Sequence, residues 1–257
     1  MIYKQAIKRF LSLVLRPISV NAPFFVFIYV LGCVTAWATL PNARGAHLYD
    51  NLYLELFLDV YFLAVVLAVL PRKIRIWVRA LIYTVLYLTA IIDVYCFVKF
   101  QSTLTPTMLL LVGETDTREA SEFLRSCVSP DVLLSRVGWV LLVLALHILR
   151  TLRLRFPHFV PRNWCRLFHS LCVRIAYMLR RVRPITALAV LLLLVASVLT
   201  SAHNKVATFK LMSGSTIGDV EHTLTEKDHA VLYQPIYRLA FSLYANTLTA
   251  KQVDRLV

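Results

Sequence analysis

Five long apolar runs, separated by polar segments, dominate the pattern of this chain. They fall at 23–40, 53–70, 77–98, 132–149 and 185–202. Each is close to the roughly 20 residues that a helix needs to cross about 30 Å of hydrocarbon. The pattern predicts an all-α fold, a polytopic membrane bundle of five transmembrane helices. Because five is odd, the two ends of the chain are expected on opposite sides of the membrane.

Three parts follow from this pattern. The segment 1–22 mixes apolar residues with four bases, which favours an interfacial segment on the inner surface. The five-span domain covers 23–203. The remaining residues, 204–257, form an outer tail.

The segment 105–128, between the third and fourth runs, predicts one or two short amphipathic helices at the outer surface. Thr105 is suited to cap a helix that begins at Pro106. Further along, Glu114 and Arg118 lie four residues apart, the spacing of a helical ion pair.

The tail contains a second amphipathic candidate. Aromatic and apolar residues recur there every three or four positions, at Tyr233, Tyr237, Phe241, Tyr244 and Leu248. This spacing places them on one face of a helix, typical of packing against protein or at a membrane interface. Such a helix accommodates Pro235 only in its first turn.

The distribution of charge predicts the orientation of the bundle. Three stretches, 1–22, 71–79 and 150–183, carry 17 of the 28 Lys and Arg residues and none of the 14 acids. Since cytoplasmic loops retain Lys and Arg, we expect these stretches and the N-terminus on the inner side of the membrane and the tail on the outer side.

Composition narrows the class further. Hydrophobic residues make up 59% of the 257 and charged residues 16%, unlike an ordinary soluble domain. The net charge of +14 is explained by topogenic loops that also contact anionic headgroups. No nucleic-acid motif accompanies it, so a nucleic-acid partner is not predicted.

The cysteines do not predict a metal site. The sequence holds neither a CxxC pair nor a Cys/His cluster with zinc spacing. Cys96 and Cys127 could meet in an oxidising compartment, and isolated buried thiols are the commoner alternative.

Three carboxylates at the outer ends of apolar runs are candidates for a functional role. Glu55 and Asp59 lie one turn apart in the second run, and Asp93 lies near the end of the third. Acids in apolar spans are costly and frequently functional. The alternative is that they are solvated, or paired with Lys99 or nearby arginines of the outer loops.

The segment 111–124, Leu-Val-Gly-Glu-Thr-Asp-Thr-Arg-Glu-Ala-Ser-Glu-Phe-Leu, resembles a motif in the membrane domain of bacterial phosphoethanolamine transferases. That family of the alkaline-phosphatase and sulfatase superfamily includes the lipid A, lipopolysaccharide-core and mobile colistin-resistance enzymes. Its outer helix reads approximately E-T-[DN]-x-x-E-A-x-E-[FY]-L. The matching residues here are Glu114, Thr115, Asp116, Glu119, Ala120, Glu122, Phe123 and Leu124.

The resemblance implies a function. Phosphatidylethanolamine would be the donor lipid, and lipopolysaccharide or lipid A the acceptor. Thr115 and Glu119 would contact the donor headgroup, with Glu114, Glu55, Asp59 and Asp93 as further candidates. By the same resemblance the membrane would be a bacterial inner membrane, with the N-terminus in the cytoplasm and the tail, 204–257, in the periplasm as a linker helix toward a catalytic domain. That domain, with its zinc, would lie outside this chain, which is expected to hold no cofactor and no catalytic residue of its own.

One match to the family is misleading. Gly113-Glu114-Thr115 repeats the letters that surround the family's nucleophilic Thr, but no Asp-His-Gly zinc motif follows in the chain. We therefore interpret this segment as part of the membrane domain.

Two other functions stay open. The chain could be a stand-alone, non-enzymatic membrane scaffold that binds a partner protein. A small transporter would require polar groups at mid-depth in the spans, and the five runs place no charged residue there.

Overall fold

The computed structural model describes residues 14–114, 118, 130–155, 184–213, 216–226 and 229–253. Within these ranges the elements are helical, as predicted, and no strand is present. The helices are α2 (Ala22–Ala38), α3 (Leu52–Val69), α4 (Arg72–Phe100), α5 (Pro106–Glu114), α7 (Pro130–Leu133), α8 (Arg136–Arg155), α10 (Pro184–Met212), α11 (Ile217–Glu226), the short 3-10 helix η2 (Ala230–Tyr233) and α12 (Pro235–Val253).

Three of the described helices are long and apolar enough to cross a membrane. They are α3, α4 and the Leu192–Met212 part of α10. The first two match the second and third predicted runs, and the last overlaps the second half of the fifth run, 185–202. A fourth candidate consists of Val14–Val20 and α2 together, but the two pieces meet at an angle of 88°. The count of five spans therefore stays a prediction.

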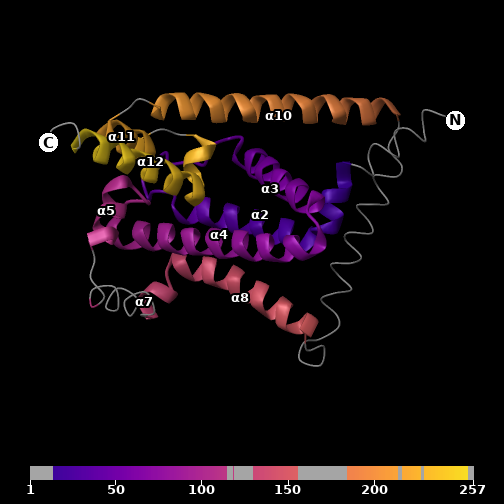
Figure 1. Cartoon of the computed structure of the whole chain (residues 1–257), viewed down its shortest axis with the longest axis horizontal. Coiled ribbons are helices and arrows are strands. Elements are labelled where there is room, and N and C mark those ends of the chain that lie inside the picture. Colours follow the sequence, from indigo (N-terminus) through magenta and orange to yellow (C-terminus); the bar gives the residue numbers. More distant parts are fainter. Residues whose placement is uncertain are drawn as a thin grey trace.

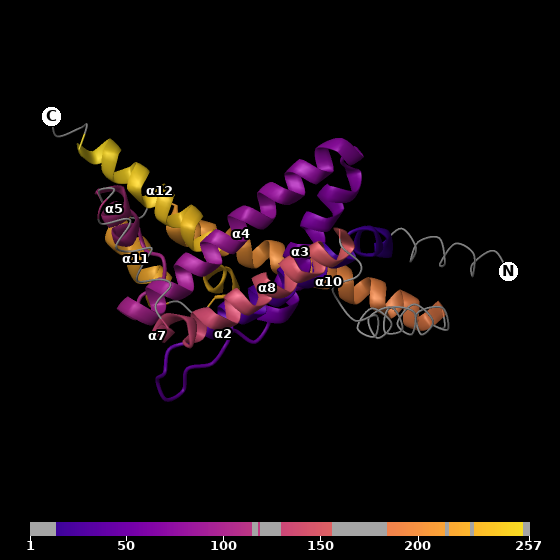
Figure 2. The ribbon, with the colours of Figure 1, turned by 90° about the horizontal axis from the view of Figure 1, so that it is seen from below.

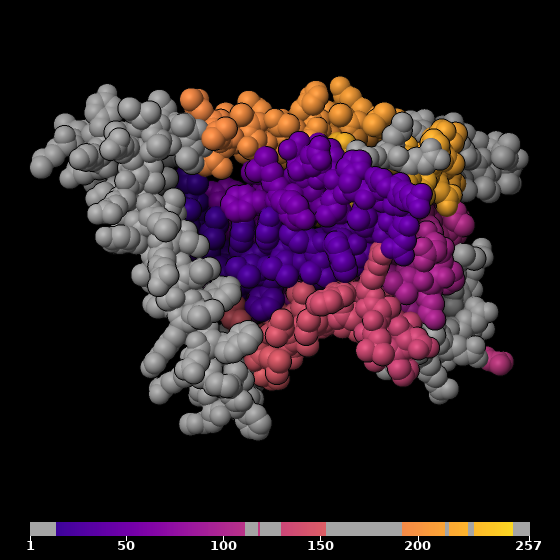
Figure 3. Space-filling model, turned by 180° about the vertical axis from the view of Figure 1, so that it is seen from behind, coloured from indigo at the N-terminus to yellow at the C-terminus, as the bar shows by residue number. Residues whose placement is uncertain are grey.

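The four helices α2, α3, α4 and α8 pack around one apolar core (Figure 1). In Figure 3, α10 lies on one side of α2 and α3, and α8 lies on the opposite side. Because lipid tails are as apolar as Leu, close packing rather than escape from water holds such helices together. The buried core residues are Phe24, Phe25, Ile28, Leu31, Ala38, Val60, Ala64, Leu67, Tyr87, Ala90, Val94, Tyr95, Val132, Val137, Val140 and Val143.

Arginines close the helix ends. Arg136, at the start of α8, donates to the carbonyl of Ala38 (3.1 Å) at the end of α2 and to that of Leu40 (2.5 Å). Arg75 donates to the carbonyl of Leu70 (2.9 Å), just after α3. The last carbonyls of a helix have no partner within it and carry partial negative charge. These arginines therefore act as helix caps, a role that the sequence does not reveal.

The bend before α2 is fixed by a similar contact. Asn21 is fully buried, its amide donates to the Ala64 carbonyl of α3 (3.1 Å), and its side-chain oxygen accepts from Arg79 of α4 (2.6 Å). A side-chain amide that joins three helices satisfies polar groups that would otherwise be unpaired. We call this end of the bundle, where α4 begins and α8 ends, the basic end.

At the other end of the bundle, the tail end, α5, α11 and α12 gather together (Figures 1 and 2). The last part of α10, α11, η2 and α12 share a small core of their own. It consists of Met212, Val220, Leu224, Val231, Leu232, Phe241 and Ala245. The tail thus folds back onto the membrane helices.

Two local predictions for this end are confirmed. The hydroxyl of Thr105 accepts from the Met108 amide (3.4 Å), and α5 begins at Pro106. Pro235 is the first residue of α12, where its missing N–H costs nothing. On the aromatic face of α12, Phe241 is buried and Tyr237 packs against the same core.

Gly138→Ala is expected to destabilise the protein by about 1–2 kcal/mol, because a Cβ at this position would lie 2.1 Å from the Leu133 carbonyl oxygen and would force α7 away from α8. Thermal unfolding in detergent measures the effect. The matched control is Gly218→Ala in α11, where the new Cβ meets nothing closer than 3.9 Å. That change should be neutral or stabilising, since Ala favours helix. Equal stability of the two variants would contradict the close approach.

Candidate functional site

Glu55 and Asp59 lie one turn apart on α3 and point toward α10. Lys205 of α10 lies between them, with its Nζ 2.8 Å from Glu55 Oε2 and 3.0 Å from Asp59 Oδ1. Glu55 also accepts hydrogen bonds from Ser201, one turn before Lys205, and from Asn204 (3.0 Å). The ammonium group and its neighbours on α10 therefore compensate two carboxylates in an apolar helix.

The second oxygen of Asp59 is bound by the tail. Oδ2 accepts from the Gln234 amide (3.0 Å) and from the Tyr237 hydroxyl (3.3 Å). Burial, and secondarily the nearby Asp59 carboxylate, raises the pKa of Tyr237, so this side chain remains a neutral donor. Through Asp59, three elements meet: α3, α10 and α12.

Asp93 of α4 is fully buried and forms a second joint. Its Oδ1 accepts from the Leu104 backbone amide (2.9 Å), and its Oδ2 lies 2.5 Å from Nη1 of Arg238, itself a buried residue of α12. The Arg238 guanidinium also donates from Nε to the Leu232 carbonyl and from Nη2 to Thr39 Oγ1 (3.5 Å), at the end of α2. One planar guanidinium thus links α2, α4, η2 and α12. Arginine is well suited to this role because its several N–H donors point in different directions from one rigid group.

The helix α5 is attached to the same tail. Its Thr107 donates to the Glu221 carboxylate of α11 (3.0 Å), and Ser242 of α12 donates to the Leu104 carbonyl (3.3 Å) just before it. Glu114 is the last residue of α5. The tail therefore holds the helix that leads directly into the motif-bearing segment.

The predicted site residues divide into two groups. Glu55, Asp59 and Asp93 lie at the junction between the bundle and the tail, each in contact with a cation of the tail or of α10. Thr115 and Glu119 lie outside the described residues, as does Cys127, and α5 ends one residue before Thr115.

Sequence reasoning missed the cations of this junction. It considered Lys99, Arg118 and Arg125 as partners for the carboxylates, whereas the partners observed in the described part of the chain are Lys205 and Arg238. The available signal was that each base lies in a long or amphipathic helix with few other charges nearby. Bases at such positions call for a carboxylate partner.

The junction does not have the ligands of a metal site. No group of three or more His, Cys, Asp or Glu residues close enough to hold a metal ion occurs among the residues that the structure describes. Asp93 is instead paired with Arg238, and Glu55 and Asp59 share Lys205. This pairing favours a role in joining α10 and the tail to the bundle.

Comparison with protein families, with curated proteins and with solved structures found no match for this chain. The class therefore rests on the molecule itself. It is an α-helical protein with helices long and apolar enough to cross a membrane, in which a buried Asp93–Arg238 ion pair joins the tail helix α12 to α4.

Proposed function

We propose that this chain is the lipid-donor-binding membrane domain of a phosphoethanolamine transferase of a bacterial inner membrane. The observation that carries the proposal is the motif from Glu114 to Leu124, which resembles that family's outer helix. In this proposal the domain has five spans, with the basic end in the cytoplasm and the tail end in the periplasm. A separate catalytic domain supplies the zinc and the nucleophile, and lipopolysaccharide or lipid A is the acceptor.

The position of α5 supports this proposal. The motif begins at the last residue of a helix that is hydrogen-bonded to the tail, and the tail is the part of the chain that would lead toward a catalytic domain. A donor lipid bound beside α5 would therefore lie close to that domain. Such an arrangement favours transfer because it fixes the distance between donor and catalyst.

Thr115 and Glu119 are the residues to which we assign headgroup contact. In a helix, residues four apart lie on one face, so a hydroxyl and a carboxylate would be presented together. The carboxylate suits the ammonium group of ethanolamine, and the hydroxyl can donate to the adjacent phosphate.

The other candidates take a different role in this proposal. Glu55, Asp59 and Asp93 are already bound by Lys205 and Arg238. A carboxylate engaged by a cation of the same chain is poorly placed to bind a cationic headgroup. We therefore assign these three to positioning the tail, and keep Glu114 as a secondary headgroup candidate.

Glu119→Ala, in the chain joined to its catalytic domain, is expected to reduce phosphoethanolamine transfer about 100-fold, because a misplaced donor costs that much in a positioned reaction. Mass spectrometry of lipopolysaccharide from cells that express each variant measures the modification. Asp131→Ala, which removes an exposed acid of α7, is the charge-matched control and should leave transfer unchanged.

Full transfer by Glu119→Ala would refute the assignment. It would leave the scaffold function as the better reading, in which the chain binds a partner through its tail end and performs no lipid chemistry. Equal loss in Asp131→Ala would instead indicate that the negative charge of the whole surface matters, and would also contradict a specific role for Glu119.

A further inference from the structure

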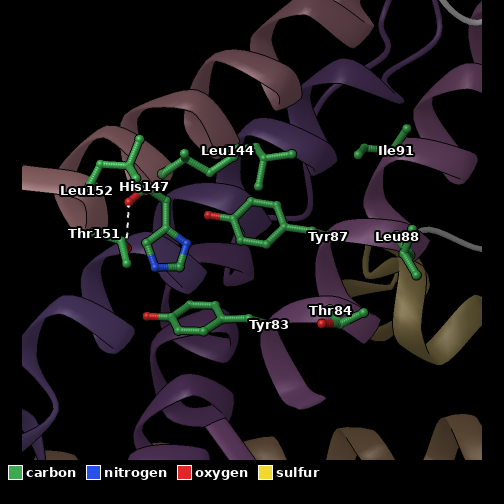
Figure 4. A pocket seen from close by; sticks show the side chains of 10 residues that line it. Tyr83, Thr84, Tyr87, Leu88, Ile91, Leu144, His147, Thr151 and Leu152 are labelled. Carbon is green, nitrogen blue, oxygen red and sulfur yellow. Dashed lines mark hydrogen bonds between the residues drawn. The ribbon is translucent and has the colours of Figure 1, made fainter. Parts of the chain in front are cut away.

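A groove of about 400 Å³ lies between α4 and α8, away from the tail junction (Figure 4). The residues that matter to its chemistry are Tyr83, Tyr87, Leu88, Ile91, Leu144 and His147. None of them takes part in the junction or in the motif described above. The groove therefore requires its own explanation.

One part of the groove is aromatic and polar. The His147 ring packs against Tyr83, with centroids 4.2 Å apart, and against Tyr87, at 5.7 Å. Figure 4 shows the Tyr87 hydroxyl beside the His147 ring. Tyr87 is 5% exposed, and its hydroxyl has no hydrogen-bond partner within the described ranges. Since buried hydroxyls are nearly always bonded, this donor points to a bound acceptor.

The rest of the groove is mostly apolar. α4 begins at the basic end, so Leu88 and Ile91 lie farther from that end than Tyr83 does, and α8 runs the opposite way, so Leu144 lies farther from it than His147. Ile148 and Leu152 line the part of the groove toward the basic end. A ligand that fits this lining has a long hydrocarbon part and a polar group that can accept from Tyr87.

The charge beside the polar part is positive. Arg79 lies one turn before Tyr83 on α4, and Arg150 lies about one turn beyond His147 on α8. Arg79 donates to the neutral side-chain amide of Asn21, and the Arg150 guanidinium lies 5.9 Å from the centroid of the Phe27 ring. These partners are uncharged, so the positive charge of the two bases can attract a negatively charged group at this end.

We infer that the groove binds one anionic phospholipid. An acyl chain lies along Leu88, Ile91 and Leu144, a glycerol-ester oxygen accepts from Tyr87, and the phosphate lies toward Arg150. This site does not depend on the proposed function, because none of its residues belongs to the motif, and α5, which leads into the motif, lies at the tail end. The inference supplies a partner for the Tyr87 hydroxyl and an occupant for the apolar part of the groove.

Competition between two lipids tests the inference. The full chain is reconstituted in equal amounts of dioleoyl phosphatidylglycerol and dioleoyl phosphatidylcholine, then transferred to detergent and weighed by native mass spectrometry. The wild type is expected to retain one phosphatidylglycerol molecule in preference to phosphatidylcholine. Equal retention of the two lipids would overturn the choice of an anionic ligand.

Two variants distinguish a built site from general surface attraction. Arg150→Gln is expected to reduce phosphatidylglycerol retention about fivefold, the effect of one base near an anionic headgroup. Arg72→Gln removes an exposed base at the same end of the bundle and should change retention little. An equal loss in both variants would mean that the lipid is held by diffuse charge, and the site would be withdrawn.

A variant whose side chain fills the groove gives an independent test of the inference. Thr84 lines the groove and is exposed, so Thr84→Trp should occupy the space without disturbing the core. We expect this variant to lose the retained lipid while its secondary structure by circular dichroism matches that of the wild type. Folded Thr84→Trp protein that still retains phosphatidylglycerol as the wild type does would exclude the groove as the binding site.

Discussion

Arg238→Met is expected to destabilise the protein by about 3–5 kcal/mol, because removing one partner of a buried ion pair leaves the other charge uncompensated. Asp93 is fully buried, and in the variant it would keep only the Leu104 amide as a donor. The carbonyl of Leu232 and the hydroxyl of Thr39 would lose a donor as well. Thermal unfolding in detergent, followed by tryptophan fluorescence, measures the loss of stability.

A second substitution separates the ion pair from the packing of the arginine stem. Asp93→Asn combined with Arg238→Met removes both charges, and it is expected to recover much of the lost stability because no buried charge then lacks a partner. Lys210→Met, which removes an exposed base of α10, is the control and should be close to neutral. If the double variant is as unstable as Arg238→Met alone, the charge pairing does not account for the effect.

Lys205→Met is expected to destabilise the contact between α10 and α3 by about 2–4 kcal/mol, since it leaves two like charges one turn apart without their shared cation. Glu55 would retain only Ser201 and Asn204, and Asp59 would retain Gln234 and Tyr237. From Leu192 onward, most side chains of α10 are exposed, so few other contacts hold this helix. We therefore expect amide exchange in α10 to be faster in Lys205→Met than in the wild type, measured by hydrogen–deuterium exchange with mass spectrometry.

Neutralising Glu55 should restore part of the stability that is lost in Lys205→Met. Glu55→Gln keeps side-chain oxygen and nitrogen in place for Ser201 and Asn204, so Lys205→Met with Glu55→Gln is expected to exchange more slowly in α10 than Lys205→Met alone. If Lys205→Met leaves exchange in α10 unchanged, then the apolar contacts of this helix suffice to hold it, and the ion triad is not what attaches α10 to the bundle.

The helical class and several helix ends could be predicted because they depend on local sequence. The runs at 53–70 and 77–98 differ little from α3 and α4, and Thr105 with Pro106 marks the start of α5. Pro235 and the aromatic spacing placed α12. Each of these features depends on periodicity or on a cap, which operate over a few residues.

The partners of the carboxylates could not be predicted in this way. Lys205 is 150 residues from Glu55, and Arg238 is 145 residues from Asp93. Periodicity indicates which face of a helix is apolar, but it does not indicate which other helix that face meets. The acids were correctly identified as unusual within apolar helices, and only the three-dimensional arrangement reveals that α10 and the tail supply their cations.

The role of the arginines at helix ends was also beyond the sequence. Arg75 and Arg79 belong to a stretch that was interpreted only as an orientation signal, and Arg136 was given no role, yet each donates to a backbone carbonyl or a buried amide oxygen. A count of bases per loop is insensitive to such contacts. A substitution that preserves charge, such as Arg136→Lys, would keep the topological signal and lose the multiple donors that close α2.

The Arg238 contacts also restrict the direction in which α12 can point. Its guanidinium contacts Asp93 of α4, Thr39 at the end of α2 and the Leu232 carbonyl of η2. These three partners belong to three different elements. A helix held at several separate points cannot tilt or rotate about any one of them without breaking a contact. A domain joined to α12 would consequently keep a fixed position and orientation relative to the bundle. Its reach would be set by the lengths of α4 and α12 rather than by diffusion on a flexible linker.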